Sequence, residues 1–206
     1  MLSSKPVFVA LSHSLDEDFC RCVETLDPRI QLIKLDSTGA PQGPEPARLD
    51  VLLVSYDYSL GGLLDEQIAD NILALAQRAA FVQTGVAGLD EPFLARIYEA
   101  SKRYVNGSGI HAVSIGQYVT MQMLRVVKEL DRHSAQQRAK SWERIFCDGE
   151  LTDKRLLIYG YGGIGQEIAR MARCMGMYVV GLKREPASDQ WADEVLAADT
   201  WQTQVP

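Results

Sequence analysis

The sequence predicts an α/β protein whose strands form mostly parallel sheets, arranged as two successive units. Short apolar runs alternate along the chain with longer segments in which apolar residues recur at helical spacing. Strands separated by helices of this length need crossover connections, and such connections make neighbouring strands parallel. A glycine-rich turn in the second half of the chain joins a further apolar run to a further helical segment. Together these observations predict the fold class.

The first unit is predicted from apolar runs that alternate with helical segments over the first hundred or so residues. Acidic residues stand at two of the helix starts, where the helix dipole favours negative charge. We therefore interpret Asp16, Glu17 and Asp18 as a helix start rather than as a catalytic carboxylate cluster, and Asp90 and Glu91 likewise suit a helix start. The predicted strands are residues 7–11, 30–35, 51–55, 80–83 and 104–106, and the predicted helices are residues 16–26, 68–77 and 91–100.

A long helix is predicted from about residue 111 to residue 130, with a polar continuation to residue 142. Its apolar stripe is typical of a core or a subunit interface rather than of a cofactor contact. A hinge-like turn is predicted at residues 147–149, and a surface loop rich in Gly and Pro at residues 37–46. The stripe consists of Ile115, Val119, Met123, Val126 and Val127.

The composition argues against several classes of protein. The chain has 206 residues and a net charge of −6 without a basic run, which argues against a general nucleic-acid binder. No apolar run approaches the roughly 18–20 residues that span a bilayer, and the run at residues 7–11 is too short for a signal-peptide core. Four scattered cysteines and three histidines predict neither a disulfide framework nor a metal site. We therefore expect a cytoplasmic protein that binds neither nucleic acid nor membrane.

The strongest functional signal is a G-x-G-x-x-G pattern that directly follows an apolar run and directly precedes a predicted helix at residues 164–175. This strand–turn–helix context is the one that a dinucleotide-binding turn requires. One glycine allows the tight turn, one lets the backbone approach a pyrophosphate, and one lets the helix lie close to the strand. The helix start then offers unpaired amides to the phosphates. The predicted pyrophosphate-binding residues are Gly160, Gly162, Gly163, Ile164 and Gly165.

The residues that follow the next predicted strand, at 178–182, bear on the choice of cofactor. Dinucleotide folds place an acidic residue there, about 20 residues after the first glycines, to bind the ribose 2′-hydroxyl. Here Lys183 and Arg184 come first and Glu185 follows. An arginine can hold a 2′-phosphate through two parallel hydrogen bonds, so the sequence favours NADP over NAD. The alternative is a solvated pair of cations, with Glu185 serving the ribose of NAD.

Several further segments, in this order and spacing, resemble the D-isomer-specific 2-hydroxyacid dehydrogenase family. Thr-Gly-Val-Ala-Gly-Leu-Asp occupies residues 84–90, and Asn-Gly-Ser-Gly-Ile-His-Ala occupies residues 106–112. Gly-Gln-Tyr follows at residues 116–118, and Glu-Leu-Thr-Asp-Lys-Arg at residues 150–155 leads into the glycine motif. The resemblance extends from about residue 50 to residue 200. One departure is Gln117, which stands where many members have Glu.

The resemblance implies a flavodoxin-like substrate domain at residues 1–108 and a Rossmann NAD(P)-binding domain at residues 109–206, of which only the first part is expected. It also implies a homodimer formed through the helices at residues 111–142, and hydride transfer between NAD(P)H and a 2-keto acid or D-2-hydroxy acid. Amides of Val86, Ala87 and Gly88 would hold the substrate carboxylate as an anion-binding nest. An alternative or additional role for this loop is a strand-to-helix turn with Asp90 as N-cap.

No residue of this sequence matches the Arg, Glu and His that catalyse the reaction in this family, so no catalytic residue is predicted. His13, His111 and His133 are interpreted as surface or capping residues. We expect a fragment without turnover of its own, with apolar faces exposed at Leu156 and its neighbours Ile158 and Val180. The alternatives are a non-catalytic, NAD(P)-binding or corepressor-like protein, and a methyltransferase, whose cofactor loop can also be rich in glycine.

Overall fold

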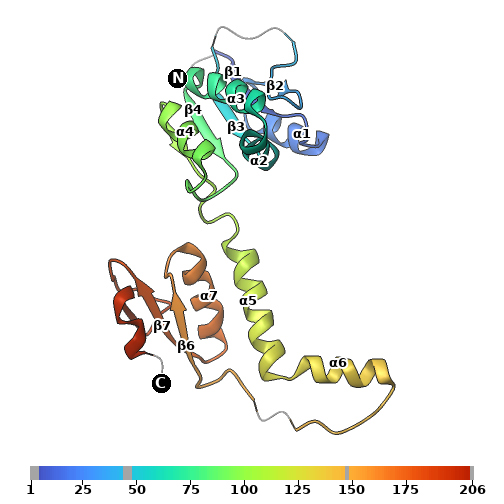
Figure 1. Ribbon diagram of the computed structural model, residues 1–206, viewed down its shortest axis with the longest axis vertical. Coiled ribbons are helices and arrows are strands. Elements are labelled where there is room, and N and C mark those ends of the chain that lie inside the picture. The colour runs from blue at the N-terminus through green and yellow to red at the C-terminus, as the bar shows by residue number, and fades with distance from the viewer. Residues whose placement is uncertain (1–4, 44–47, 147–148, 205–206) are drawn as a thin grey trace. The chain divides into compact units, whose positions relative to one another are not determined.

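A computed structural model describes residues 5–43, 48–146 and 149–204. The chain divides into two compact units, Met1–Ser108 and Gly109–Pro206, and each contains its own parallel sheet (Figure 1). The predicted turn at residues 147–149 lies mostly outside the described residues, and so does the end of the predicted loop at residues 37–46. No helix of the described residues has the length and apolarity needed to cross a membrane.

The sheet of the first unit has the strand order β2-β1-β3-β4-β5, and all of its neighbours are parallel. This order is the flavodoxin-like one, in which the chain reverses direction across the sheet between β1 and β3. The predicted α/β class is confirmed, and every strand predicted for this unit is present within a residue or two. The strands are β1 (Val7–Ser12), β2 (Ile30–Leu35), β3 (Val51–Val54), β4 (Phe81–Thr84) and β5 (Tyr104–Val105).

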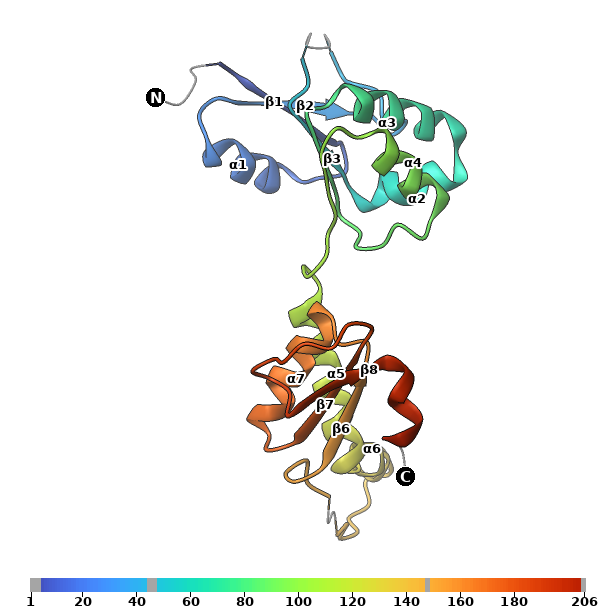
Figure 2. The same ribbon diagram turned by 90° about the vertical axis from the view of Figure 1, so that its left-hand side faces the viewer.

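Helices cover both faces of this sheet, with α1 on one side and the other three on the opposite side (Figure 2). The core lies under those three helices, where Leu52 and Val82 from the strands meet Ile72 and Ile97, all fully buried. The helices are α1 (Glu17–Leu26), α2 (Tyr56–Leu64), α3 (Glu66–Arg78) and α4 (Pro92–Ala100).

Both helices that were predicted to start at acidic residues do so, but the N-cap residue is the predicted one in only one of them. Asp16 is the N-cap of α1, and its carboxylate accepts a hydrogen bond of 2.7 Å from the amide of Phe19. The interpretation of this acidic cluster as a helix start is therefore confirmed. The N-cap of α4 is Glu91, without a side-chain hydrogen bond, so the assignment of Asp90 as N-cap was wrong.

The second unit has a three-stranded parallel sheet in the order β6-β7-β8, with α7 connecting the first two strands. Helix α5 packs on α7, and both contribute to a core with β6 and β7. The expected exposure of apolar faces was wrong for Ile158 and Val180, which are buried, while Leu156 is half-buried. The elements are β6 (Arg155–Tyr159), α7 (Gly163–Cys174), β7 (Tyr178–Lys183), β8 (Glu194–Ala197) and the 3-10 helix η1 (Ala198–Thr203).

The predicted long helix is two helices, α5 (Ala112–Val127) and α6 (Leu130–Ala139). They are separated at Lys128 and Glu129, where Glu129 adopts a left-handed conformation with φ 48°. The prediction of one helix with a polar continuation was wrong, because neither residue at the break is a Gly or Pro that would mark a helix end.

Candidate functional site

Strand β6 ends in the glycine-rich turn at the carboxyl edge of the second sheet. Gly160 has φ +97°, a left-handed conformation that favours glycine. The amides of Gly160 and Tyr161 both donate to the carbonyl of Leu182 in β7, at 3.1 and 2.8 Å. These hydrogen bonds fix the turn to the neighbouring strand, directly in front of α7.

The glycines of the turn have different surroundings. A Cβ atom placed on Gly160, Gly162 or Gly163 would meet no atom within 4 Å. A Cβ atom on Gly165 would lie 2.6 Å from the carbonyl oxygen of Gly160, a severe clash. The first glycines therefore border open space, while Gly165 permits the close contact of helix and strand.

The start of α7 presents amide donors to this open space. The first amide of the helix to find a partner is that of Gln166, which donates to Gly162 at 2.8 Å. The amides of Gly163, Ile164 and Gly165 have no acceptor among the described residues. The first turn of α7 also contains no acidic residue. Free amides at the positive end of a helix dipole, beside open space, fit a diphosphate group.

Tyr161 lies inside the motif with its side chain buried. Its ring covers Gly181 of β7, where a Cβ atom would lie 2.4 Å from the ring. Its hydroxyl donates a hydrogen bond of 2.9 Å to the carboxylate of Asp189. Burial raises the pKa of Tyr161, and the hydrogen bond to Asp189 adds to the effect. The hydroxyl therefore remains a donor at neutral pH.

Asp189 joins the segment after β7 to the start of α7. Besides the Tyr161 hydroxyl, it accepts hydrogen bonds from the amide of Trp191 at 2.8 Å and from the side-chain amide of Gln166 at 3.3 Å. No sequence signal points to the contact between Tyr161 and Asp189. Tyr161 occupies a variable position of the glycine motif, and Asp189 belongs to no motif. Both residues position the turn rather than face the open space.

Lys183 and Arg184 lie at the same edge of the sheet as the turn. Tyr159 pairs with Leu182 in parallel register, so Lys183, the last residue of β7, lies level with Gly160, and Arg184 directly follows the strand. Both cations are exposed, and neither has an ion-pair partner in the described part of the chain. Glu185 is exposed beside them. This arrangement suits a phosphate group near the ribose, and it leaves Glu185 available as well.

In the first unit, carbonyl oxygens of the loop after β4 accept hydrogen bonds from other residues of the unit. The carbonyl of Val86 accepts hydrogen bonds from the amide of Gly107 at 2.8 Å and from the hydroxyl of Thr84 at 3.2 Å. The carbonyl of Ala87 accepts one of 2.6 Å from the side chain of Asn106. The amides of Val86, Ala87 and Gly88 have no acceptor among the described residues. We call residues 86–88 the anion loop, because consecutive free amides form a nest for an anion.

A hydroxyl-rich cluster occupies the carboxyl ends of β1 and β3, where the strand order reverses. The carboxylate of Asp57 accepts hydrogen bonds from Ser12 at 2.5 Å, from Ser14 at 3.0 Å and from Ser55. Burial alone would raise the pKa of Asp57, but these hydrogen bonds outweigh it and the pKa is lowered.

The described residues include no group of His, Cys, Asp and Glu that could hold a metal ion.

The three histidines are distributed over separate elements. The ring of His13 lies 6.4 Å from that of Tyr58, His111 is the N-cap of α5 without a side-chain hydrogen bond, and His133 is exposed on α6. Gly116 is buried where α5 packs on α7, and the neighbouring Gln117 is exposed.

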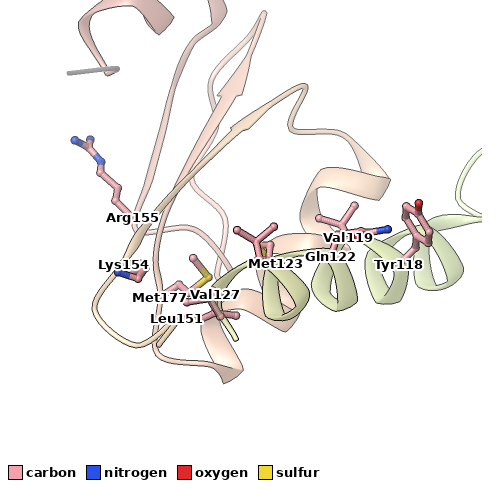
Figure 3. A pocket seen from close by; sticks show the side chains of 10 residues that line it. Tyr118, Val119, Gln122, Met123, Val127, Leu151, Lys154, Arg155 and Met177 are labelled. Carbon is pink, nitrogen blue, oxygen red and sulfur yellow. The ribbon is translucent and has the colours of Figure 1, made fainter. Parts of the chain in front are cut away.

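A separate apolar hollow of about 540 Å³ lies between α5 and the amino end of β6 (Figure 3). Arg155 is the first residue of β6, so this hollow is at the opposite end of the strand from the glycine-rich turn. It is lined by Tyr118, Val119, Gln122, Met123, Val126, Val127, Leu151, Lys154, Arg155 and Met177.

The fold and the glycine-rich turn together define a Rossmann-type dinucleotide-binding unit. Residues 120–204 match the family model described as "D-isomer specific 2-hydroxyacid dehydrogenase, NAD binding domain". The second unit is therefore similar to the NAD-binding domain of this family, as the sequence predicts, and it has the fold of an NAD(P)-binding domain.

Curated relatives match about half of the chain. A hydroxypyruvate reductase of Thermotoga maritima is 25% identical over 115 residues, which are 55% of this chain and 38% of that protein. A D-3-phosphoglycerate dehydrogenase of Methanocaldococcus jannaschii is 22% identical over 116 residues, which are 56% of this chain and 22% of that protein. The chain therefore matches well under half the length of these relatives.

Solved structures of the family share the fold over nearly the whole chain. A family protein from Aeromonas salmonicida has a TM-score of 0.70 and 21% identity, covering 98% of this chain and 61% of that one. A D-isomer specific 2-hydroxyacid dehydrogenase from Xanthobacter autotrophicus, solved in complex with NADPH and MES, has a TM-score of 0.72 and 16% identity. That match covers 96% of this chain and 59% of the Xanthobacter chain.

Proposed function

We propose that the protein takes part in NAD(P)-dependent interconversion of 2-keto acids and D-2-hydroxy acids, with NADP as the preferred cofactor. The observation that carries this proposal is the set of free amides at Gly163, Ile164 and Gly165, facing the open space beside Gly160 and Gly162. The bound cofactor supplies the hydride, and the residues of this chain hold and orient the reactants.

Each predicted site residue has a role in this proposal. The glycine-rich turn holds the diphosphate, and Arg184 with Lys183 holds the 2′-phosphate through charge-assisted hydrogen bonds. The anion loop, residues 86–88, holds the carboxylate of the acid. The hydroxypyruvate reductase and the phosphoglycerate dehydrogenase among the relatives support a small 2-hydroxy or 2-keto acid as substrate.

Ligand titration followed by tryptophan fluorescence tests the cofactor assignment, with Trp191 as a reporter because Asp189 holds its backbone near the turn. We expect NADPH to bind more tightly than NADH, and S-adenosylmethionine not to bind. Arg184→Ala should weaken NADPH binding about tenfold or more, since a charge-assisted hydrogen bond contributes roughly 1.5–3 kcal/mol, and should leave NADH unchanged. Arg138→Ala, an exposed cation on α6, is the matched control. Equal loss of NADH binding in Arg184→Ala would argue against NADP recognition.

We also propose that these 206 residues bind both ligands without turnover. The turn and the anion loop supply backbone amides and cations, and the chain offers no match to the family's catalytic Arg, Glu and His. Oxidation of NADPH with glyoxylate or hydroxypyruvate should stay at the buffer background. Steady-state oxidation above that background would contradict this proposal.

We further propose that two copies pair through residues 111–142, in the cytoplasm. Helix α5 exposes several large apolar side chains, among them Val113, Tyr118, Met121 and Val126, and two of these, Tyr118 and Val126, line the apolar hollow of Figure 3. Light scattering coupled to size exclusion should give twice the chain mass of 22.9 kDa. Val126→Asp should shift the mass toward the monomer, and Val105→Asp in the first unit should not. A monomeric unmodified chain would contradict pairing.

A further inference from the structure

The first unit contains a second hollow, of about 190 Å³, next to the anion loop. Its walls come from α2, from α4 and from the segment that carries the anion loop. The lining consists of Tyr56, Ser59, Leu60, Leu63, Val86, Glu91 and Leu94. We call it the side pocket.

The position of the side pocket ties it to the anion loop. Val86 lines the pocket and is also the first of the three residues whose amides are free, and Glu91 closes the same segment at the start of α4. Helix α2 follows β3 and α4 follows β4, so the pocket lies at the carboxyl ends of two adjacent parallel strands.

The lining of the pocket consists mostly of apolar side chains and includes no positively charged residue. Leu94 forms a buried part of it, while Leu60 and Leu63 are 46% and 39% exposed, so an apolar wall is left open to a ligand. The hydroxyl of buried Ser59 already donates to the carbonyl of Ser55 at 3.0 Å. Glu91 is the one charged residue of the lining as the structure describes it. An anionic group here would lose hydration beside a carboxylate and gain no cation.

We propose that the side pocket takes the substituent of a 2-keto or 2-hydroxy acid whose carboxylate is held by the anion loop, and that this substituent is apolar and uncharged. The inference rests on the proposed function. A volume of about 190 Å³ is below the roughly 300–1,000 Å³ of pockets for drug-sized ligands, so it suits a substituent of a few carbon atoms. The favoured acids carry a short aliphatic group, and acids with a phosphate or a second carboxylate are disfavoured.

The test is an NMR titration of the complete ¹⁵N-labelled chain with three acids, followed at the amides of Val86, Ala87 and Gly88. The probes are 4-methyl-2-oxopentanoate, pyruvate and 3-phosphohydroxypyruvate. We expect the first to bind about tenfold or more tightly than pyruvate, because burial of its extra carbon atoms is favourable. The phosphorylated acid should bind no more tightly than pyruvate.

Variants on α2 and α4 make the test specific. Leu63→Asn should remove the preference for 4-methyl-2-oxopentanoate, and Leu64→Asn, on the same helix but 81% exposed and outside the lining, should retain it. Glu91→Gln should improve binding of the phosphorylated acid, and Glu99→Gln, exposed on α4, should not. Amide spectra and melting temperatures verify that each variant is folded.

Equal affinities for the two unphosphorylated acids, a preference for the phosphorylated acid, identical behaviour of the two leucine variants, or no shift at the anion loop would overturn the inference. Failure of the proposed function has a separate readout in the same samples. NADPH would then fail to shift the amides of Gly163, Ile164 and Gly165, whatever the acids do at the anion loop.

Discussion

Gly162 and Gly165 belong to the same glycine motif, but glycine is required at the two positions for different reasons. Gly162 has φ −98°, and a methyl group added to it would have no neighbour within 4 Å, so alanine fits the protein there and intrudes only on a bound phosphate. Gly162→Ala should keep the melting temperature and weaken NADPH binding about tenfold or more, since the lost contacts are charge-assisted hydrogen bonds. Differential scanning fluorimetry and a fluorescence titration measure the two quantities.

Gly165→Ala should have the opposite profile, with stability lost first. Its methyl group would lie 2.6 Å from the Gly160 carbonyl, which forces helix and strand apart. We expect a loss of about 1–3 kcal/mol in the free energy of unfolding, typical of overpacking at a close contact. Urea denaturation followed by circular dichroism measures it. Unchanged stability in Gly165→Ala would show that the close contact is absent in solution.

Tyr161 and Asp189 give a prediction about positioning. Tyr161→Phe keeps the ring over Gly181 and removes the hydroxyl that donates to Asp189. The expected loss is about 1 kcal/mol in the free energy of unfolding, the net contribution of one hydrogen bond, with NADPH affinity reduced a fewfold. Tyr159→Phe, at a residue that is 71% exposed, should change neither quantity. Equal effects of the two substitutions would contradict a positioning role for Tyr161.

At the scale of elements, the Ser12–Asp57 contact joins the end of β1 to the start of α2 and predicts a dependence of stability on pH. The pKa of Asp57 is lower in the folded protein than its usual 3.8, so its contribution is complete above that value and declines as the pH falls through the folded pKa. The free energy of unfolding of the first unit should therefore decrease as the pH is lowered below about 4. Asp57→Asn should be less stable at pH 7 and lose less on acidification, as urea denaturation at pH 7 and pH 3 would show.

The elements that the sequence predicted and those that it missed differ in a physical way. Strands such as β1 were found because a strand inside a parallel sheet is covered on both faces and therefore has a nearly continuous apolar run. Helix α2 was missed because it contains Gly61 and Gly62, which oppose helix formation locally. The structure supplies the reason for one of them: a Cβ atom on Gly62 would lie 2.2 Å from the ring of Phe93 on α4. The contact between α2 and α4 therefore requires glycine at position 62, and the local sequence does not show this contact.

The candidate site was predictable to the extent that it consists of backbone. The glycine-rich turn has a motif because amides and close contacts require glycine at fixed spacing. Asp189 has no such constraint on its position in the sequence, since it reaches Tyr161 through the folding of the segment after β7. The side pocket escaped prediction for the same reason, because its walls come from α2 and α4.

At the scale of the whole molecule, each unit has its own core, so damage to one should leave the other intact. Ile72→Ala creates a cavity in the first core and should lower the stability of that unit by about 2–5 kcal/mol without changing NADPH affinity. Val179→Ala, in the second core, should weaken NADPH binding. Calorimetry with and without NADPH separates the two transitions. Loss of NADPH binding in Ile72→Ala would show that the units depend on each other.

The exposure of helix α6 should make its helical content depend on the protein concentration. It follows the left-handed Glu129 and buries none of its ten residues within the described chain. A peptide helix shorter than about 12–15 residues is marginal in water without a covering surface. Helical content measured by circular dichroism should therefore rise as the protein is concentrated, and amide hydrogens of α6 should exchange within seconds in dilute samples and slowly in concentrated ones. The helical content of α6 would then report on the self-association of the protein.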